Sequence, residues 1–272
     1  MNPPADWLLP DWPAPPGVHA LFTTRAGGVS MAPFDSFNLG DHVHDDPVAV
    51  AANRSRLTWC LGARPVFLQQ VHGTTVATLD NETPDRTVAD ACVTTERQLA
   101  CTVMVADCLP VLFTDTEGVV VGAAHAGWRG LAGSEPGRGV LESCCAALGE
   151  ALRQRQPSLA AADVPDRLMA WLGPCIGPDA FEVGEDVRAT FVAWRPDAAA
   201  CFRPLPREGK YLADLPQLAR LRLRAWGITR LYGNDGTAPW CTVTQASRFF
   251  SHRRDAVRLG STGRMAACIH IG

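Results

Sequence analysis

Short apolar runs, separated by glycine-containing and polar turns, make up most of the first half of the chain. Runs of this length that are rich in valine predict buried strands. We expect strands at residues 19–24, 66–71, 75–79, 100–105, 111–114 and 119–124. One helix interrupts them, because Asp46-Pro47 has the form of a helix start and Gly62 that of a helix end.

The period changes after Gly139, where apolar residues recur every three to four positions. This spacing predicts helices over residues 140–152, 183–194 and 214–226. Further strands are expected at 168–172, 228–232, 249–252 and 265–271. Several strands in succession, followed by helices that alternate with strands, favour an α/β (α+β) fold of layered sheets flanked by helices over a doubly wound sheet.

Composition is that of a globular enzyme, with 272 residues of which 47% are hydrophobic and 19% charged. No linker divides the chain, so we expect one domain over residues 1–272, with a proline-rich N-terminal segment at 1–17. The net charge of -3 gives no electrostatic reason to expect nucleic acid or a membrane as a partner. Neither a secretory leader nor an apolar stretch long enough to cross a bilayer is present, and a cytoplasmic location is the expectation.

Three residues that bind soft or borderline metals stand at breaks in expected buried strands. They are His72 in QQVHG, Cys108 in ADC and His125 in GAAHAGWRG. The other cysteines form no CxxC pair, and most lie within apolar runs typical of buried residues. A catalytic zinc site usually has three protein ligands and leaves a fourth position to water, so this trio is a candidate zinc site.

The same residues also have ordinary structural interpretations, and spacing alone does not decide between them. A single histidine or cysteine at a strand end is usually a packed core residue. Asp107 either orients a metal-binding imidazole, acts as a base, or caps a turn. Arg129 either holds an anion or is solvated.

A set of ordered motifs resembles the bacterial YfiH-like laccase-domain proteins. The motifs are QVHG, ADCLPVLF, HAGWRGL, WLGPCIGP, FEVG, KYLADLPQLAR, FFSHRRD and TGRM, and the resemblance runs from about Val18 to the C-terminus. It implies a four-layer α/β/β/α sandwich related to cysteine-dependent deamidating toxins. It also implies His72, Cys108 and His125 as metal ligands, with Zn²⁺ favoured over copper.

The resemblance further implies an enzyme that cleaves adenosine, inosine or methylthioadenosine with phosphate and also deaminates adenosine. Its expected partners are a purine nucleoside and phosphate, and its expected state is a monomer or a weak homo-oligomer. The candidate phosphate- or substrate-binding residues are Arg25, Asn38, Arg129, Arg253 and Arg254. For deamination, Asp107 or Glu182 is the candidate proton carrier.

Other classes of protein stay open beside this one. Cys108 as nucleophile and His125 as its base would make an amide hydrolase that edits peptidoglycan precursors. A copper polyphenol oxidase is less favoured, because the chain has seven histidines and one HxH pair, His42 and His44. A purine-binding module without catalysis is the third class.

The sequence departs from the family pattern at two places, and the first of them either alters substrate preference or only lengthens a surface loop. Ser134 to Arg138 reads as an insertion near the proposed site, and His252 stands where a tyrosine is usual.

Overall fold

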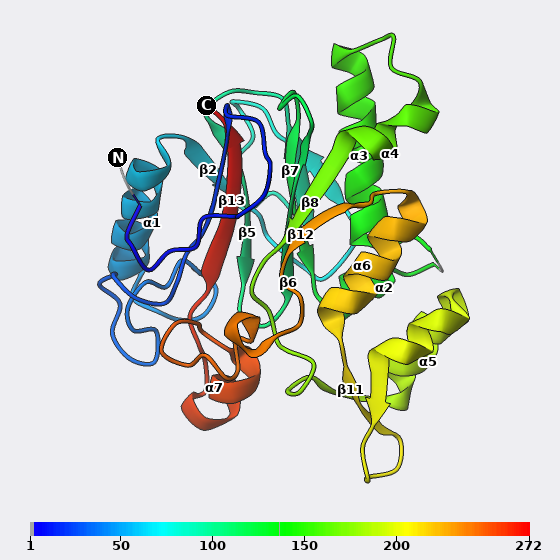
Figure 1. The fold of residues 1–272 in the computed structure, drawn as a ribbon. Coiled ribbons are helices and arrows are strands. Elements are labelled where there is room, and N and C mark those ends of the chain that lie inside the picture. Colours follow the sequence, from blue (N-terminus) through cyan, green and yellow to red (C-terminus); the bar gives the residue numbers. More distant parts are fainter. Residues whose placement is uncertain (1–2, 136) are drawn as a thin grey trace.

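Two β-sheets form the centre of the molecule (Figure 1). The structure is a computed structural model that describes residues 3–135 and 137–272. In the four-stranded sheet, the order is β1 (Val18–Phe22), β13 (Met265–Ile271), β5 (Leu99–Val105) and β2 (Arg64–Phe67). In the six-stranded sheet, it is β12 (Arg230–Gly233), β8 (Leu168–Leu172), β6 (Leu109–Asp115), β7 (Val121–Ala126), β4 (Ala91–Thr94) and β3 (Val76–Thr78).

The remaining strands form a small separate sheet, ordered β10 (Phe202–Pro204), β11 (Lys210–Ala213) and β9 (Glu182–Gly184). The helices are α1 (Pro47–Leu61), α2 (Trp128–Ala132), α3 (Val140–Arg155), α4 (Val164–Arg167), α5 (Glu185–Trp194), α6 (Leu215–Trp226) and α7 (His252–Leu259). Short 3-10 helices lie at Ala161–Asp163, Pro196–Cys201 and Ala238–Trp240. None of the helices in the described residues is long and apolar enough to cross a membrane.

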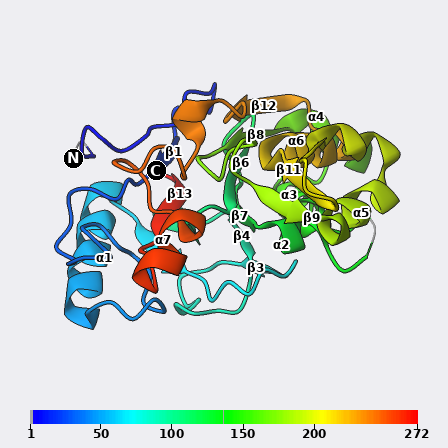
Figure 2. The same cartoon turned by 90° about the horizontal axis from the view of Figure 1, so that it is seen from below.

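Apolar side chains fill the space between the two large sheets and cover both of their outer faces. Between the sheets, Val103 and Ile269 pack in one cluster with Leu112. Helices α3 and α6 cover the outer face of the six-stranded sheet, and α1 covers the outer face of the four-stranded sheet. Seen along the layers, α1 and the pair α3 and α6 lie on opposite sides of the sheets (Figure 2).

The predicted mixed α/β class is therefore confirmed. The molecule has elements outside the four layers that the family resemblance implies. The small sheet with α5, and helix α7, lie beside the two large sheets (Figure 1). The segment before β1 is anchored to the four-stranded sheet, since Leu8 pairs with Phe22 and Trp7 is buried against Phe37.

Helix boundaries follow the signals in the sequence. The Asp46 side chain accepts a hydrogen bond from the Val48 amide at the start of α1. Gly62 ends that helix in the left-handed conformation, with a φ of 65°. The periodic residues of α3 are buried, as expected.

Two expectations about local structure are wrong, and several short strands were not expected. The segment 249–252 is not a strand, because Ser251 is the N-cap of α7 and its side chain accepts a hydrogen bond from the Arg254 amide. Val183 belongs to β9 rather than to a helix. Strand β4 and the small sheet were not expected, because strands of three or four residues are too short for an alternating pattern to stand out.

Two connections carry the chain from the four-stranded to the six-stranded sheet, and both matter for the site. One leads from β2 to β3 and includes His72, and the other leads from β5 to β6 through Asp107 and Cys108. His125 lies in β7 of the six-stranded sheet, paired with Pro110 at the start of β6. The crossings bring segments together that are distant in the sequence.

Candidate metal centre

His72, Cys108 and His125 converge, as predicted. Their ligand atoms all lie within 4.8 Å of one another, and the sulfur of Cys108 is 3.7 Å from Nε2 of His72. The two imidazole rings meet edge to face with centroids 4.8 Å apart. Tetrahedral bonds of zinc to sulfur and nitrogen would separate these two atoms by roughly 3.6 Å, so the trio fits a zinc ion.

The three side chains differ in how deeply they are buried. His125 is buried, Cys108 is half-buried and His72 is exposed. The candidate site thus opens on the His72 side, where a fourth ligand or a substrate could approach.

Gly127 leaves the room that this convergence needs. A Cβ atom at this position would lie 2.8 Å from Cδ2 of His72 and 2.9 Å from the sulfur of Cys108. Such contacts are too short for real side chains, and the backbone of Gly127 is otherwise ordinary, with a φ of -68°. The glycine before Trp128 in the HAGWRG motif is therefore required by close approach and not by an unusual backbone conformation.

A buried carboxylate that sequence reasoning missed supports the trio. Nδ1 of His125 lies 2.9 Å from Oδ1 of Asp90, a residue with no exposed surface. This contact leaves Nε2 of His125 to face the other two ligands. The sequence predicts Asp107 as a candidate for orienting an imidazole, but the carboxylate in contact with His125 is that of Asp90.

The electrostatics of the site favour a charged pair between Cys108 and His125. Burial would raise the pKa of Cys108, but the positive charge of His125 and hydrogen bonds from both histidines outweigh it and lower the pKa to about 6. Burial likewise would lower the pKa of His125, but the negative charge of Cys108 and the bond to Asp90 raise it to about 9. A thiolate is the form of cysteine that binds metals and attacks electrophiles.

The trio lines a cavity of about 610 Å³ with a strongly basic wall. The arginines that line it are Arg86, Arg129, Arg253 and Arg264, and its carboxylates are Asp41 and Asp107. Arg129 and Arg253 were expected here. Arg86 and Arg264 were not, although Arg264 lies within the TGRM motif that carries part of the family resemblance.

Arg264 is held in place by the segment after Phe37. Oδ1 of Asn38 accepts a hydrogen bond from the Arg264 amide at 2.8 Å, and the Leu39 amide donates to the Arg264 carbonyl at 3.0 Å. Gly40 lets the arginine stem pass, because a Cβ there would lie 2.8 Å from its Cγ. One guanidinium nitrogen, Nη1, donates to two backbone carbonyls, and the arginine lines the cavity.

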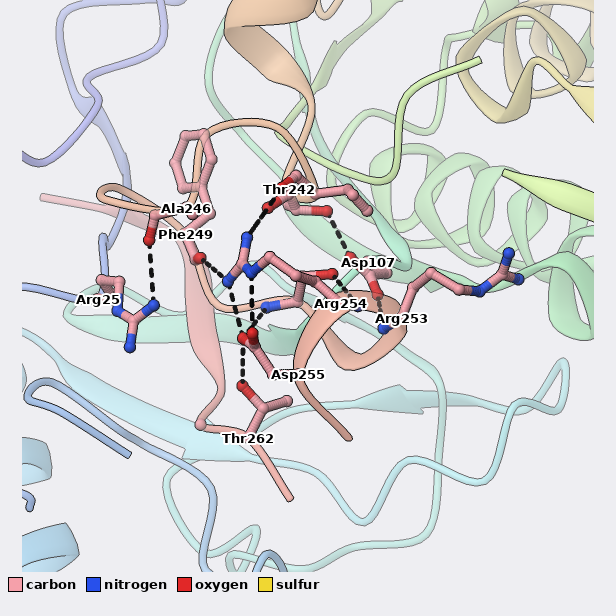
Figure 3. Close-up of polar contacts among 12 residues, drawn as sticks. Arg25, Asp107, Thr242, Ala246, Phe249, Arg253, Arg254, Asp255 and Thr262 are labelled. Atoms are coloured by element: carbon pink, nitrogen blue, oxygen red, sulfur yellow. Dashed lines mark hydrogen bonds and ion pairs between the residues drawn. The ribbon is translucent and has the colours of Figure 1, made fainter. Parts of the chain in front are cut away.

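The other three candidate phosphate-binding residues do not line this cavity. Arg25 donates to the carbonyl of Ala246 (Figure 3). It also donates to Asp35, and it lines a separate shallow pocket. Arg254 is bonded to backbone carbonyls and to Asp255 (Figure 3). Asn38 is buried, and its side-chain NH₂ donates to the Gly40 carbonyl and to Asp45. Its Oδ1 accepts from the Arg264 amide, so its observed role is to hold Arg264.

The two candidate proton carriers differ in position. Asp107 lines the cavity with a φ of 92°, and its carboxylate accepts from the Thr242 hydroxyl at 2.5 Å and from the Arg253 amide at 2.6 Å (Figure 3). Glu182 is paired with Arg207 and does not line the cavity.

The two departures from the family pattern also have places in the structure. His252 begins α7 and lines the cavity. Ser134 to Arg138 lies between α2 and α3, with position 136 outside the described residues. Gly137 approaches Trp194, and none of the segment's described residues lines the cavity.

Histidines elsewhere do not add to a copper set. Within residues 3–135 and 137–272, the trio is the one group of three or more histidine, cysteine or acidic side chains close enough to share an ion. His19 and His270 face each other across β1 and β13. A set of several copper centres would need more histidines near one another.

Comparisons with known proteins show the family and agree with the fold. Residues 19–272 match the family model described as multi-copper polyphenol oxidoreductase laccase. A purine nucleoside phosphorylase of Pseudomonas aeruginosa is 49% identical over 97% of this chain and 98% of its own. The purine nucleoside phosphorylase YfiH of Escherichia coli is 45% identical over 97% of this chain and 98% of its own.

A solved structure is also similar to this chain in fold and sequence. The crystal structure of a Neisseria meningitidis protein superposes with a TM-score of 0.85 and 44% identity, over 98% of this chain and 99% of that one. The matches cover nearly the whole chain, including the three segments that carry the cluster. The chain therefore belongs to the YfiH-like laccase-domain family.

Proposed function

We propose that this protein is a zinc-dependent purine nucleoside phosphorylase that also deaminates adenosine. The observation that carries the proposal is the His72, Cys108 and His125 cluster on the wall of a cavity with four arginines. Relatives named purine nucleoside phosphorylase support the substrate class. Adenosine, inosine and methylthioadenosine are the proposed nucleosides, and phosphate is the second substrate.

Phosphorolysis breaks the bond between the sugar C1′ and the purine nitrogen, joins a phosphate oxygen to C1′, and gives a proton to the departing base. The basic wall suits the phosphate that must be held near C1′, since arginine guanidinium groups bind phosphate with several hydrogen bonds at once. Arg264 is the best candidate, because backbone hydrogen bonds hold it in place and because it lines the same cavity as Cys108 and Asp107. A bound Zn²⁺ would supply a Lewis acid and an anchoring charge for substrate oxygens.

Apolar groups that line the cavity suit the base. Trp128, Ile176 and Phe181 line it, and aromatic faces stack well on flat purine rings. Deamination at the purine ring needs a proton carrier, and Asp107 is the carboxylate of the cavity next to Cys108. Its two hydrogen-bond donors hold the carboxylate in one orientation.

The test is an assay of the metal-quantified protein with adenosine, with and without phosphate, followed by identification of the products. Adenine with ribose 1-phosphate supports phosphorolysis, and inosine supports deamination. Cys108→Ala should abolish both and lower the zinc content, whereas Cys60→Ala, the other half-buried cysteine, should change neither. Folded zinc protein that leaves adenosine unchanged would reject the proposal.

A second function is favoured by one specific observation. Cys108, His125 and Asp90 form a chain of thiol, imidazole and carboxylate, as in cysteine hydrolases, and the pKa of the thiol is lowered to about 6. A cysteine-dependent amide hydrolase that acts on peptidoglycan precursors would use this chain. Metal-free protein that is alkylated at Cys108 near neutral pH and thereby loses amidase activity would support it, and Cys60 is the matched reference thiol.

A further inference from the structure

A single buried carboxylate, that of Asp90, contacts both histidines of the cluster. Oδ1 accepts from the His72 amide at 2.8 Å and lies 2.9 Å from Nδ1 of His125. Oδ2 accepts from the amides of Val71 at 3.1 Å and Gly73 at 2.7 Å. The Asp90 side chain has no exposed surface, and water cannot replace these bonds.

These bonds determine which histidine nitrogen can bind a metal. A carboxylate that already accepts three amide hydrogens can only accept from His125, so Nδ1 must carry the proton. In the neutral form that a metal binds, Nε2 of His125 is then left with the lone pair, which points toward Cys108 and His72. The backbone strengthens the arrangement, because the His125 amide donates to the Asp90 carbonyl at 2.7 Å.

The contact with His72 works through the backbone. His72 has a φ of 60°, a left-handed conformation that a residue with a Cβ adopts only when its surroundings hold it. Three consecutive amides, of Val71, His72 and Gly73, converge on the Asp90 carboxylate and hold this turn. This backbone conformation directs Nε2 of His72 toward the sulfur of Cys108.

We propose that Asp90 is the positioning residue of the site: it sets the tautomer of His125 and the turn of His72, so that both Nε2 atoms meet Cys108 around one divalent cation. The inference rests on the metal site of the proposed function but not on any substrate. Carboxylates bonded to metal-binding histidines commonly contribute roughly 10- to 100-fold to metal affinity.

The test compares Asp90→Asn with Asp115→Asn in Co²⁺ titrations followed by visible absorption. Asp115 is a matched control, because it is also fully buried and accepts from three amides, those of Glu117, Val119 and Val120, but does not line the cavity. We expect Asp90→Asn to weaken Co²⁺ binding roughly 10- to 100-fold and to change the absorption spectrum. Asp115→Asn should lower the melting temperature but keep wild-type affinity and spectrum.

Several results would overturn the inference. Wild-type affinity and spectrum in Asp90→Asn would do so, as would equal losses in both variants or a wild-type protein that binds no Co²⁺. Failure of phosphorolysis with normal Co²⁺ binding would reject the proposed function and leave this inference intact.

A measurement on the wild-type protein covers the case in which Asp90→Asn does not fold. Nitrogen-15 NMR of the histidine side chains, with the His125 signal assigned by its loss in His125→Gln, reports the tautomer directly. With Zn²⁺ bound, we expect a proton on Nδ1 of His125 and none on Nε2, which the metal then occupies. The opposite tautomer would contradict the role of Asp90.

Discussion

Two residues of the cavity show how single side chains, or their absence, shape the site. Gly127 leaves space for His72 and Cys108, and Arg264 supplies a fixed positive charge beside them. Neither is a metal ligand, and each has a distinct measurable effect.

Gly127→Ala should disrupt the cluster while leaving the fold intact. The new methyl group must displace His72 or Cys108, because it would lie less than 3 Å from both. We expect metal affinity to fall by roughly 10- to 100-fold, the range found when support of a ligand is lost. Gly17→Ala is the control, since a Cβ there meets nothing within 4 Å. Unchanged Zn²⁺ affinity in Gly127→Ala would show that the site has more room than the structure indicates.

Arg264→Gln should raise KM for phosphate more than KM for the nucleoside. A neutral amide cannot provide the charge-assisted hydrogen bonds that a guanidinium makes to phosphate, a loss of about 1.5–3 kcal/mol. Arg25→Gln serves as control, because Arg25 lies beside the separate pocket and should leave KM for phosphate unchanged. Steady-state kinetics with each substrate varied separately measures both KM values. An unchanged KM for phosphate in Arg264→Gln would assign phosphate binding to another arginine.

Helix α7 illustrates what an element contributes, because its first turn closes one side of the cavity. The Arg253 amide of this turn donates to Asp107, and the Arg254 side chain ties the turn to Thr242, Phe249 and Asp255 (Figure 3). The helix is therefore anchored by polar groups, and its stability should depend on pH.

Asp255→Asn should destabilise the protein at neutral pH and have less effect in acid. Burial would raise the pKa of Asp255, but hydrogen bonds and positive charge from Arg254 outweigh it and lower the pKa below 3.8. A carboxylate with a lowered pKa contributes stability that is present above its ordinary pKa and is lost as the pH falls through the folded value. We expect a loss of about 1–3 kcal/mol near pH 7, and a smaller difference below about pH 4.

Thermal unfolding at several pH values measures this difference. Asp179→Asn is the control, because Asp179 forms an exposed ion pair with Arg203, and such pairs contribute little. A difference in stability between wild type and Asp255→Asn that stays constant with pH would contradict the ionic explanation.

At the scale of the whole molecule, the cluster joins segments from both large sheets. His72 and Cys108 lie where the chain crosses between the sheets, and His125 lies within the six-stranded one. A cation bound by all three would therefore stabilise the packing of the sheets as well as supply chemistry.

Zn²⁺ should raise the melting temperature of the wild-type protein. A ligand that binds only the folded state adds about 2.7 kcal/mol when its concentration is 100 times Kd. For a chain of this size, that corresponds to roughly 5–10 °C. Cys108→Ala should lose the shift and Cys60→Ala should keep it, and equal shifts in both would mean that Zn²⁺ binds elsewhere. Differential scanning calorimetry with and without a chelator makes the comparison.

The sequence by itself determined most helices, the longer strands and the three metal-binding residues. These features are local: Asp46 and Gly62 bound α1 because of their own side-chain and backbone preferences, and the apolar positions of α3 repeat with the helical period. The trio was recognisable because each member interrupts or ends an apolar run. Strands as short as β9 carry too few residues to show a period.

Only the tertiary structure decided which of the other polar residues belong to the site. Arg264 lines the cavity and Arg25 does not, although both lie in polar segments next to buried strands. Asp90 contacts His125 from 35 positions away, through a carboxylate that resembles many others in the sequence. The physical reason is that a side chain's direction depends on how the two sheets pack and where the chain crosses between them, and no local pattern encodes that.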